Sequence, residues 1–286
     1  MRAHGVLSGF PAAGATDHVC WVYDDDADFD AAVREFLSGG LERGERLLAV
    51  GERVIDSLRA QTAVLGDVDA LIAAGTLETL TLAQAYAAAE PFAPEDQLAY
   101  YDSATQRAID AGYRGLRVIA EVSSLAADPA VRPDLVRWEH FADDYIAQGT
   151  GFTAMCAYSR TLTREALADV AAVHPQVHGP EGVPSFRVFF DDDRLVLAGS
   201  VDTFGADRLA RVLASSPVGA GAAVLDLSLA EFLDVSACRV LARWARDLQD
   251  RGRHVQVRNA APLLRRMWRI LALDELVPVD FAGAAA

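Results

Sequence analysis

The sequence of 286 residues contains no lysine, and the 26 basic side chains other than histidine are all arginine. This absence excludes Schiff-base chemistry and the lysine of a phosphate-binding P-loop. The chain also has no His-Glu-x-x-His sequence, no glycine-rich phosphate loop and no recognisable nucleophile elbow. We therefore predict that the protein is not an enzyme and has no cofactor.

Cysteines and long apolar runs are also scarce. Cys20, Cys156 and Cys238 are odd in number and far apart, which does not indicate a disulfide framework. No stretch approaches the roughly 20 apolar residues that a membrane helix needs. Residues 1–15 lack the apolar core of a signal peptide. We expect a cytoplasmic protein with no contact to the membrane.

The net charge of −15 indicates which classes of partner the protein can bind. Acidic surfaces repel nucleic acid and anionic membranes, so neither is expected to bind. The same surface is suited to a basic protein partner.

The length and the hydrophobic content of 52% are sufficient for two domains with cores of their own. Residues 174–184, HPQVHGPEGVP, are rich in proline and glycine and have no periodicity, which predicts a boundary. We expect a flexible lead-in at 1–16, a first domain at 17–176, a linker at 177–184 and a second domain at 185–282.

Strand and helix patterns alternate through the first domain. Apolar runs predict strands at 18–24, 46–50, 77–82, 116–121 and 152–158. Apolar spacing and helix-start signals predict helices from residue 28 and at 54–65, 94–111, 132–148 and 163–173. The alternation predicts an α/β fold with a mainly parallel sheet covered on both faces. Glycines 39, 40 and 44 are interpreted as a turn after the first helix.

Open parallel sheets bind ligands at the carboxyl ends of their strands. We predict ligand-binding roles for residues in or directly after the predicted strands: His18, Cys20, Asp24, Glu121 and Tyr158. Glu121 follows an apolar run, where a carboxylate is costly to bury unless it is paired or used. The alternative for Glu121 is a strand-end carboxylate that is solvated or paired with an arginine.

His18 and Cys20 are two residues apart, so both face one side of the sheet. If their strand neighbours that of Cys156, the three side chains approach closely enough for zinc or for a thiol site. Buried cysteines more often act as small apolar residues, and we predict no metal. Glu139 and His140 are expected at the rim of their helix, and His174 is expected to end a helix before proline.

The second domain is organised around residues 222–238, AAVLDLSLAEFLDVSAC. An apolar strand ends at Asp226, residues 228–233 are read as a short connection, and a helix with apolar spacing begins after Asp234. Ser236 is therefore expected at a helix N-terminus, where backbone N–H groups favour negative charge. A phosphate there would add about −1.5 to −2 charges. The alternative is that Asp234 and Ser236 are ordinary capping residues.

Several segments in order make the first domain similar to the MEDS family, the methanogen/methylotroph sensory domain: DHVCWVYDD, FLSGGLERGERLLAV, GLRVIAEVS, RWEHFADDY, TAMCAYSR and AVHP. The resemblance implies a RecA-like, mainly parallel α/β/α sandwich that lacks a P-loop. It also implies a role in sensing a small organic ligand.

Residues 185–281 resemble a STAS domain of the anti-sigma-factor antagonist type. The resemblance rests on the segments SFRVFF, RLVLAGSVD, AAVLDLS, FLDVSAC, HVQVRN and LLRRMWRILALDEL. It implies phosphorylation of Ser236 by an anti-sigma-factor serine kinase, with partner contacts at Asp234, Ser236, Ala237 and Cys238. The usual segment is Asp-Ser-Ser-Gly, and Val235 and Ala237 depart from it.

Together these features predict a regulatory protein of the anti-sigma-factor antagonist type. A small ligand or other signal at the first domain would control binding of the kinase by the second, with phosphorylation of Ser236 as the switch. The alternative is a ligand-sensing module whose STAS domain is a protein-interaction scaffold without phosphorylation.

Overall fold

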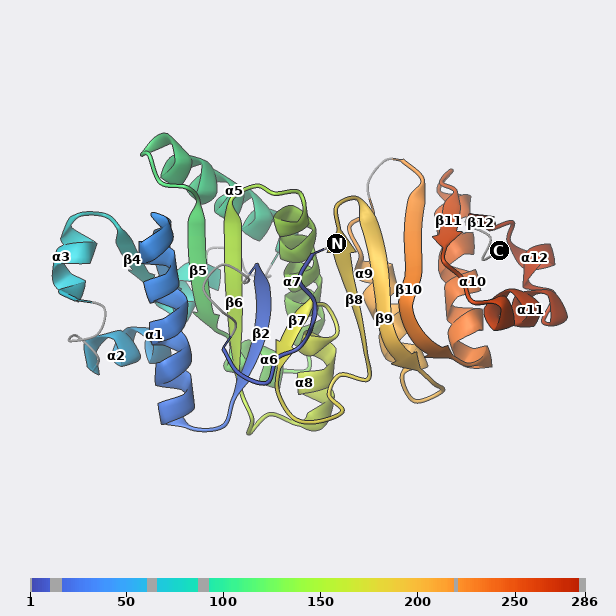
Figure 1. Ribbon diagram of the computed structural model, residues 1–286, viewed down its shortest axis with the longest axis horizontal. Coiled ribbons are helices and arrows are strands. Elements are labelled where there is room, and N and C mark those ends of the chain that lie inside the picture. Colours follow the sequence, from blue (N-terminus) through green and yellow to red (C-terminus); the bar gives the residue numbers. More distant parts are fainter. Residues whose placement is uncertain (1, 11–16, 61–65, 87–92, 219–220, 283–286) are drawn as a thin grey trace.

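The computed structural model describes residues 2–10, 17–60, 66–86, 93–218 and 221–282, and it contains two β-sheets (Figure 1). The first sheet has seven parallel strands in the order β1-β7-β2-β6-β5-β3-β4. They are β1 (Gly5–Val6), β2 (His18–Tyr23), β3 (Arg46–Val50), β4 (Leu77–Leu80), β5 (Leu116–Glu121), β6 (Phe152–Ser159) and β7 (Gln176–His178). The predicted α/β fold with a parallel sheet is confirmed.

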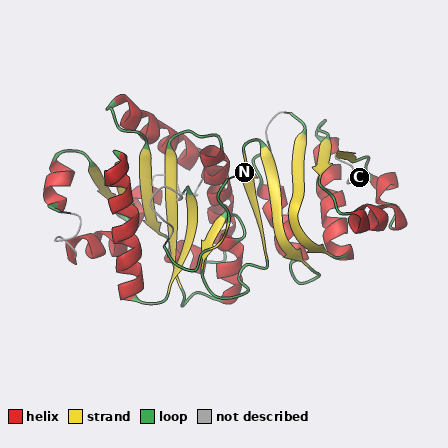
Figure 2. Ribbon diagram, viewed as in Figure 1, coloured by secondary structure: helices red, strands yellow, loops and turns green. Residues whose placement is uncertain are grey.

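Helices cover both faces of this sheet, so its central strands are buried throughout (Figure 2). Helices α1 and α2 pack on one face, and α5, α7 and α8 pack on the other. The helices of this half are α1 (Asp26–Arg43), α2 (Glu52–Ala60), α3 (Val68–Ala73), α4 (Leu82–Tyr86), α5 (Pro94–Asp110), α6 (Ser123–Ala127), α7 (Arg132–Ala147) and α8 (Arg164–Ala171). Residues 61–65 of the predicted helix 54–65 lie outside the described residues.

The predicted turn at glycines 39, 40 and 44 is wrong for the first two. Helix α1 continues through Gly39 and Gly40 and ends at Gly44, which adopts a left-handed conformation with φ 69°. A Cβ on Gly40 would lie 2.5 Å from Leu47 Cδ2 and 2.6 Å from Arg117 Cδ. Gly40 is therefore a contact residue that lets α1 approach the sheet closely.

The two adjacent glycines of α1 give opposite predictions. Gly40→Ala is expected to lower the free energy of unfolding by about 1–3 kcal/mol, because the new methyl group overpacks a filled core. A Cβ on Gly39 meets nothing within 4 Å. Gly39→Ala is therefore expected to raise the free energy of unfolding by up to about 1 kcal/mol through helix propensity. Urea denaturation of both variants measures the difference, and equal effects would show that Gly40 makes no close contact.

The N-terminal segment is part of the fold, whereas a flexible lead-in was predicted for residues 1–16. Strand β1 pairs in parallel with β7 at the edge of the sheet. Arg2 forms an ion pair with Asp143 at 3.0 Å, and its guanidinium donates to the carbonyl of Phe190 at 2.6 Å. Residue 1 and residues 11–16 of the predicted lead-in lie outside the described residues.

The second sheet has five strands in the order β12-β11-β10-β9-β8, parallel except for the antiparallel pair β8 and β9. Its strands are β8 (Phe186–Asp191), β9 (Arg194–Val201), β10 (Ala223–Leu233), β11 (Val255–Arg258) and β12 (Asp280–Ala282). The helices are α9 (Ala206–Ser215), α10 (Val235–Asp250), α11 (Pro262–Ile270) and α12 (Leu273–Leu276). Residues 228–233, predicted as a connection, continue β10 and pair with β9 across two register shifts.

The two halves pack together through one continuous apolar core. Helix α7 lies between the first sheet and β8 of the second (Figure 1). The backbone N–H of Val188 donates to the carbonyl of Ala172 at 2.7 Å, and Arg187 donates to the carbonyl of Pro175 at 2.5 Å. The predicted linker begins inside β7, so the chain between the halves is short and the contact is direct.

None of the helices in the described ranges combines the length and the apolar character needed to cross a bilayer.

Candidate functional site

A group of polar side chains is buried on the face of the first sheet that α7 covers. Residues alternate between the two faces of a strand, so His18 and Cys20 of β2 share this face. Strand β6 lies next to β2 with Cys20 opposite Cys156, and Tyr158 follows on the same side. The condition stated for these side chains, that the strands of Cys20 and Cys156 are neighbours, is met in the structure.

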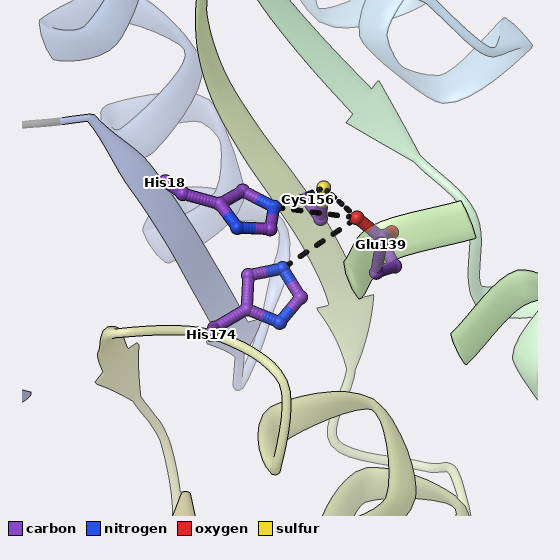
Figure 3. Close-up of side chains that lie close together, drawn as sticks. All are labelled: His18, Glu139, Cys156 and His174. Carbon is purple, nitrogen blue, oxygen red and sulfur yellow. Dashed lines mark hydrogen bonds and ion pairs between the residues drawn. The ribbon is translucent and has the colours of Figure 1, made fainter. Parts of the chain in front are cut away.

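Four residues on this face form what we call the buried cluster: His18, Glu139, Cys156 and His174 (Figure 3). One potential ligand atom from each lies within 4.8 Å of the others, and all four residues are buried. Glu139 is central, because its Oε2 is 3.0 Å from Cys156 Sγ, 3.4 Å from His18 Nε2 and 3.7 Å from His174 Nε2. His18 Nε2 lies 3.9 Å from Cys156 Sγ.

Groups around the buried cluster hold its members in position. His18 Nδ1 donates to Asp143 Oδ1 at 3.1 Å, and His174 Nδ1 donates to the carbonyl of Val170 at 2.9 Å. The Tyr158 hydroxyl donates to Glu139 Oε1 at 2.8 Å. Both imidazoles thus use Nδ1 as a donor and turn Nε2 toward Glu139.

Burial and close charges set the protonation of the buried cluster. Burial disfavours the charged form of His18, but hydrogen bonds to Asp143 and Glu139 outweigh this and raise its pKa to about 9. Burial and the nearby charge of His18 lower the pKa of His174 to about 3. Burial also raises the pKa of the Cys156 thiol well above its usual value, and the Glu139 carboxylate adds to this. One imidazole is therefore charged and the other neutral beside one carboxylate.

Sequence reasoning placed Glu139 and His140 at the rim of α7, and this is wrong. Both side chains are buried. Glu139 lies on the face of α7 that carries Leu135 and Ala142, and the ring of His140 packs against Phe190 of β8, with ring centroids 5.0 Å apart. The spacing of four between Glu139 and Asp143, in register with apolar residues, was a signal that both acids point inward. His174 does end the segment after α8, but its ring also completes the buried cluster.

The five predicted ligand residues fall into two separate places. His18 is a member of the buried cluster, and Tyr158 contacts it through Glu139. Cys20 lies beside the cluster, opposite Cys156 on the next strand. Asp24 and Glu121 lie at the carboxyl ends of β2 and β5, where Tyr23 donates to Glu121 at 2.9 Å.

The carboxyl-end group is more open than the buried cluster. Asp24 is exposed and pairs with Arg160 at 2.7 Å. Glu121 is partly buried and accepts a hydrogen bond from the Ser123 hydroxyl as well as from Tyr23. The alternative for Glu121 was a carboxylate that is solvated or paired with an arginine, whereas its hydrogen bonds in the structure come from the hydroxyl groups of Tyr23 and Ser123.

A cleft of about 960 Å³ lies between the two halves and does not contain any of the five predicted residues. Asp169 of α8 pairs there with Arg132, Arg208 and Arg211. These ion pairs join α7 and α8 to α9 of the second half, so the cleft wall is part of the contact between the halves.

In the second half, Asp234 is the N-cap of α10 and accepts from the backbone N–H of Ala237 at 2.9 Å. Ser236 is the second residue of the helix, and its hydroxyl lies 3.1 Å from Thr203 Oγ1. Thr203 in turn donates to Asp234 at 2.9 Å. Of the four predicted partner contacts, Ala237 and Cys238 are buried in the core, so Asp234 and Ser236 are the two that reach the surface.

Large apolar side chains flank Ser236 on the surface. Phe204, next to Thr203, is 93% exposed, Phe232 is 53% exposed and Val235 is 38% exposed. Exposed aromatic residues around a polar centre are typical of protein interaction surfaces. We call Thr203, Phe204, Phe232, Val235 and Ser236 the α10 surface.

The fold and these two sites define a two-domain α/β protein with a polar cluster in one domain and an open helix N-terminus in the other. Residues 17–175 match the family described as MEDS, the MEthanogen/methylotroph, DcmR Sensory domain, and the chain belongs to this family. Residues 186–278 match the family described as Mlab, STAS domain. Both resemblances drawn from the sequence are confirmed. No curated protein matches the chain.

The first half is thus a sensory domain, and the second is a STAS domain, which implies signalling of the anti-sigma-factor antagonist kind through partner proteins. Both families are regulatory rather than catalytic.

Proposed function

We propose that this protein binds an anti-sigma-factor serine kinase through the α10 surface and releases it when Ser236 is phosphorylated. The observation that carries the proposal is the position of Ser236, a partly exposed hydroxyl at a helix N-terminus between exposed apolar side chains. Unphosphorylated protein would sequester the kinase and free a sigma factor.

A phosphate on Ser236 would change this surface in two ways. The helix N-terminus favours its negative charge. The phosphate would also lie close to the Asp234 carboxylate, which Thr203 links to Ser236. Like-charge repulsion and the cost of desolvating the phosphate would then oppose contact with a partner.

We further propose where the first domain binds its small ligand. The first choice is the face of the first sheet that carries His18, Cys20 and Tyr158, and the second choice is the strand ends that carry Asp24 and Glu121. Asp143 supports the first choice. Its Oδ1 accepts from His18, and its Oδ2 accepts from the backbone N–H of Phe190 in β8 at 2.6 Å. The side chain of Asp143 therefore links His18 directly to β8 of the STAS sheet, so a movement of His18 can reach that sheet through one residue.

The test compares kinase binding by the full chain and by Ser236 variants, using the cognate kinase identified by copurification from the native host. Ser236→Asp is expected to weaken binding at least about tenfold, which corresponds to about 1.4 kcal/mol, whereas Ser236→Ala is expected to retain binding. Titration calorimetry measures the dissociation constants. Ser103→Asp, at an exposed serine of α5 in the first half, is the matched control and is expected to bind like wild type.

Phosphopeptide mass spectrometry of the chain from its host supplies the second readout. A phosphate on Ser236 whose occupancy changes with growth condition is expected. Equal binding by the Asp and Ala variants, together with an unmodified Ser236, would overturn the proposal and favour the alternative of a STAS scaffold without phosphorylation.

A further inference from the structure

We propose that the buried cluster is a binding site for a divalent cation of borderline softness, for which Zn²⁺ is the representative. The inference rests on the first domain alone and does not depend on the role of Ser236. Two imidazoles, one thiol and one carboxylate are the donor types that Zn²⁺ takes in proteins.

The spacing of the four donors is close to that of a tetrahedral site, since all of them lie within 4.8 Å of one another. Zinc bonds of about 2.0–2.3 Å place the corners of a tetrahedron about 3.3–3.8 Å apart. The Nε2 atoms of His18 and His174 lie 3.4 Å and 3.7 Å from Glu139 Oε2. Cys156 Sγ lies 3.0 Å from the same oxygen and 3.9 Å from His18 Nε2. Small side-chain movements are enough to centre an ion among them.

The surrounding hydrogen bonds are those that orient metal ligands. A ligating histidine almost always donates its other ring nitrogen to a carboxylate or a backbone carbonyl. His18 does the first with Asp143, and His174 does the second with Val170. Tyr158 holds the second oxygen of Glu139, so three ligands have an oriented coordinating atom.

His174 supplies an independent observation. Its Nε2 is buried, faces Glu139 (Figure 3), and has no hydrogen-bond partner among the described residues. Because His174 Nδ1 donates to a carbonyl, Nε2 carries a lone pair that accepts from no group there. A buried acceptor without a donor is costly, and a cation is a suitable partner for it.

The charges around the buried cluster also favour a cation. Two buried carboxylates, those of Glu139 and Asp143, lie beside the guanidinium of Arg2, which pairs with Asp143 at 3.0 Å. The coordinating atoms of Cys156 and of both imidazoles would be deprotonated in the complex, because metal ligands must be deprotonated.

The experiment titrates Zn²⁺ and Co²⁺ into the full chain after removal of metals with a chelator. We expect one ion per chain by elemental analysis, a rise in melting temperature on addition of Zn²⁺, and a tetrahedral Co²⁺ spectrum with a thiolate charge-transfer band. The proposal is overturned if the wild-type chain binds no ion or if its Co²⁺ spectrum lacks the thiolate band.

Variants locate the ion. Cys156→Ser is expected to abolish the thiolate band, and His174→Ala to weaken Zn²⁺ binding at least about 100-fold. Cys238→Ser is the matched control, because Cys238 is also a buried free cysteine but lies in α10 of the second half and is not a member of the buried cluster. It is expected to bind one ion with the wild-type spectrum. Retention of the ion by both ligand variants would place it elsewhere and refute the site.

Discussion

Asp143→Ala is expected to lower the free energy of unfolding by about 3–5 kcal/mol, because it leaves buried charged partners without their counter-charge. Asp143 is fully buried, pairs with Arg2 at 3.0 Å and accepts from His18 at 3.1 Å. It also accepts from the backbone N–H of Phe190. No other carboxylate among the described residues joins the N-terminal segment, the buried cluster and the second sheet in this way.

The neighbouring residue is the matched control. Burial raises the pKa of Asp144 to about 6, so its charged form is disfavoured in the folded state. Asp144→Ala is therefore expected to leave the free energy of unfolding nearly unchanged or to raise it. Urea denaturation followed by tryptophan fluorescence measures both variants. Similar small effects for the two would mean that the contacts of Asp143 contribute little to stability.

Phe190→Ala is expected to lower the free energy of unfolding by about 3–5 kcal/mol, since it empties a core position between the halves. Phe190 is buried on β8, and its ring centroid lies 5.0 Å from that of His140 on α7. Because one core spans both halves, we also expect the wild-type chain to unfold in a single cooperative transition. In the variant, the STAS half is expected to unfold separately.

Probes in each half distinguish these outcomes. Trp138 reports on the first half and Trp268 on the second, so single-tryptophan chains follow each transition by fluorescence. Phe204→Ala is the control, because Phe204 is an exposed phenylalanine of the same half and should leave stability unchanged. Independent unfolding of the halves in the wild-type chain would contradict a shared core.

Local patterns predicted most elements of the first half. The apolar runs of β2, β5 and β6 are buried on both faces, so their composition alone indicates central parallel strands. The start of α10 was also predicted, because Asp234 is followed directly by residues with helical apolar spacing. The strand at 228–233 was missed, since this end of the central strand β10 is exposed or only partly buried, pairs with β9 across two register shifts and lacks the alternation of a half-buried strand.

The candidate site was predicted in part. His18 shares a sheet face with Cys20, and Cys156 shares one with Tyr158, because side chains alternate along a strand, and a sequence contains that alternation. The pairing of β2 with β6 puts both pairs on the same face. Glu139 and His174 lie 121 residues and 156 residues along the chain from His18, and no local pattern relates them. The inward face of α7 was recognised from its leucine and tryptophan, but Glu139 and His140 were placed at the rim because they are polar.

The sequence by itself determined the family, the order of the two domains, the parallel sheet and the position of Ser236 at a helix start. The sheet and the helix start follow from short-range periodicity and capping residues, which act within one turn or one strand, whereas the family and the domain order follow from segments that resemble known domains. Only the tertiary structure decided that the halves share a core, that Arg2 and Asp143 connect them, and that four distant donors meet around Glu139. Such contacts depend on how strands are ordered and helices are packed, so they are properties of the folded chain and not of any one segment.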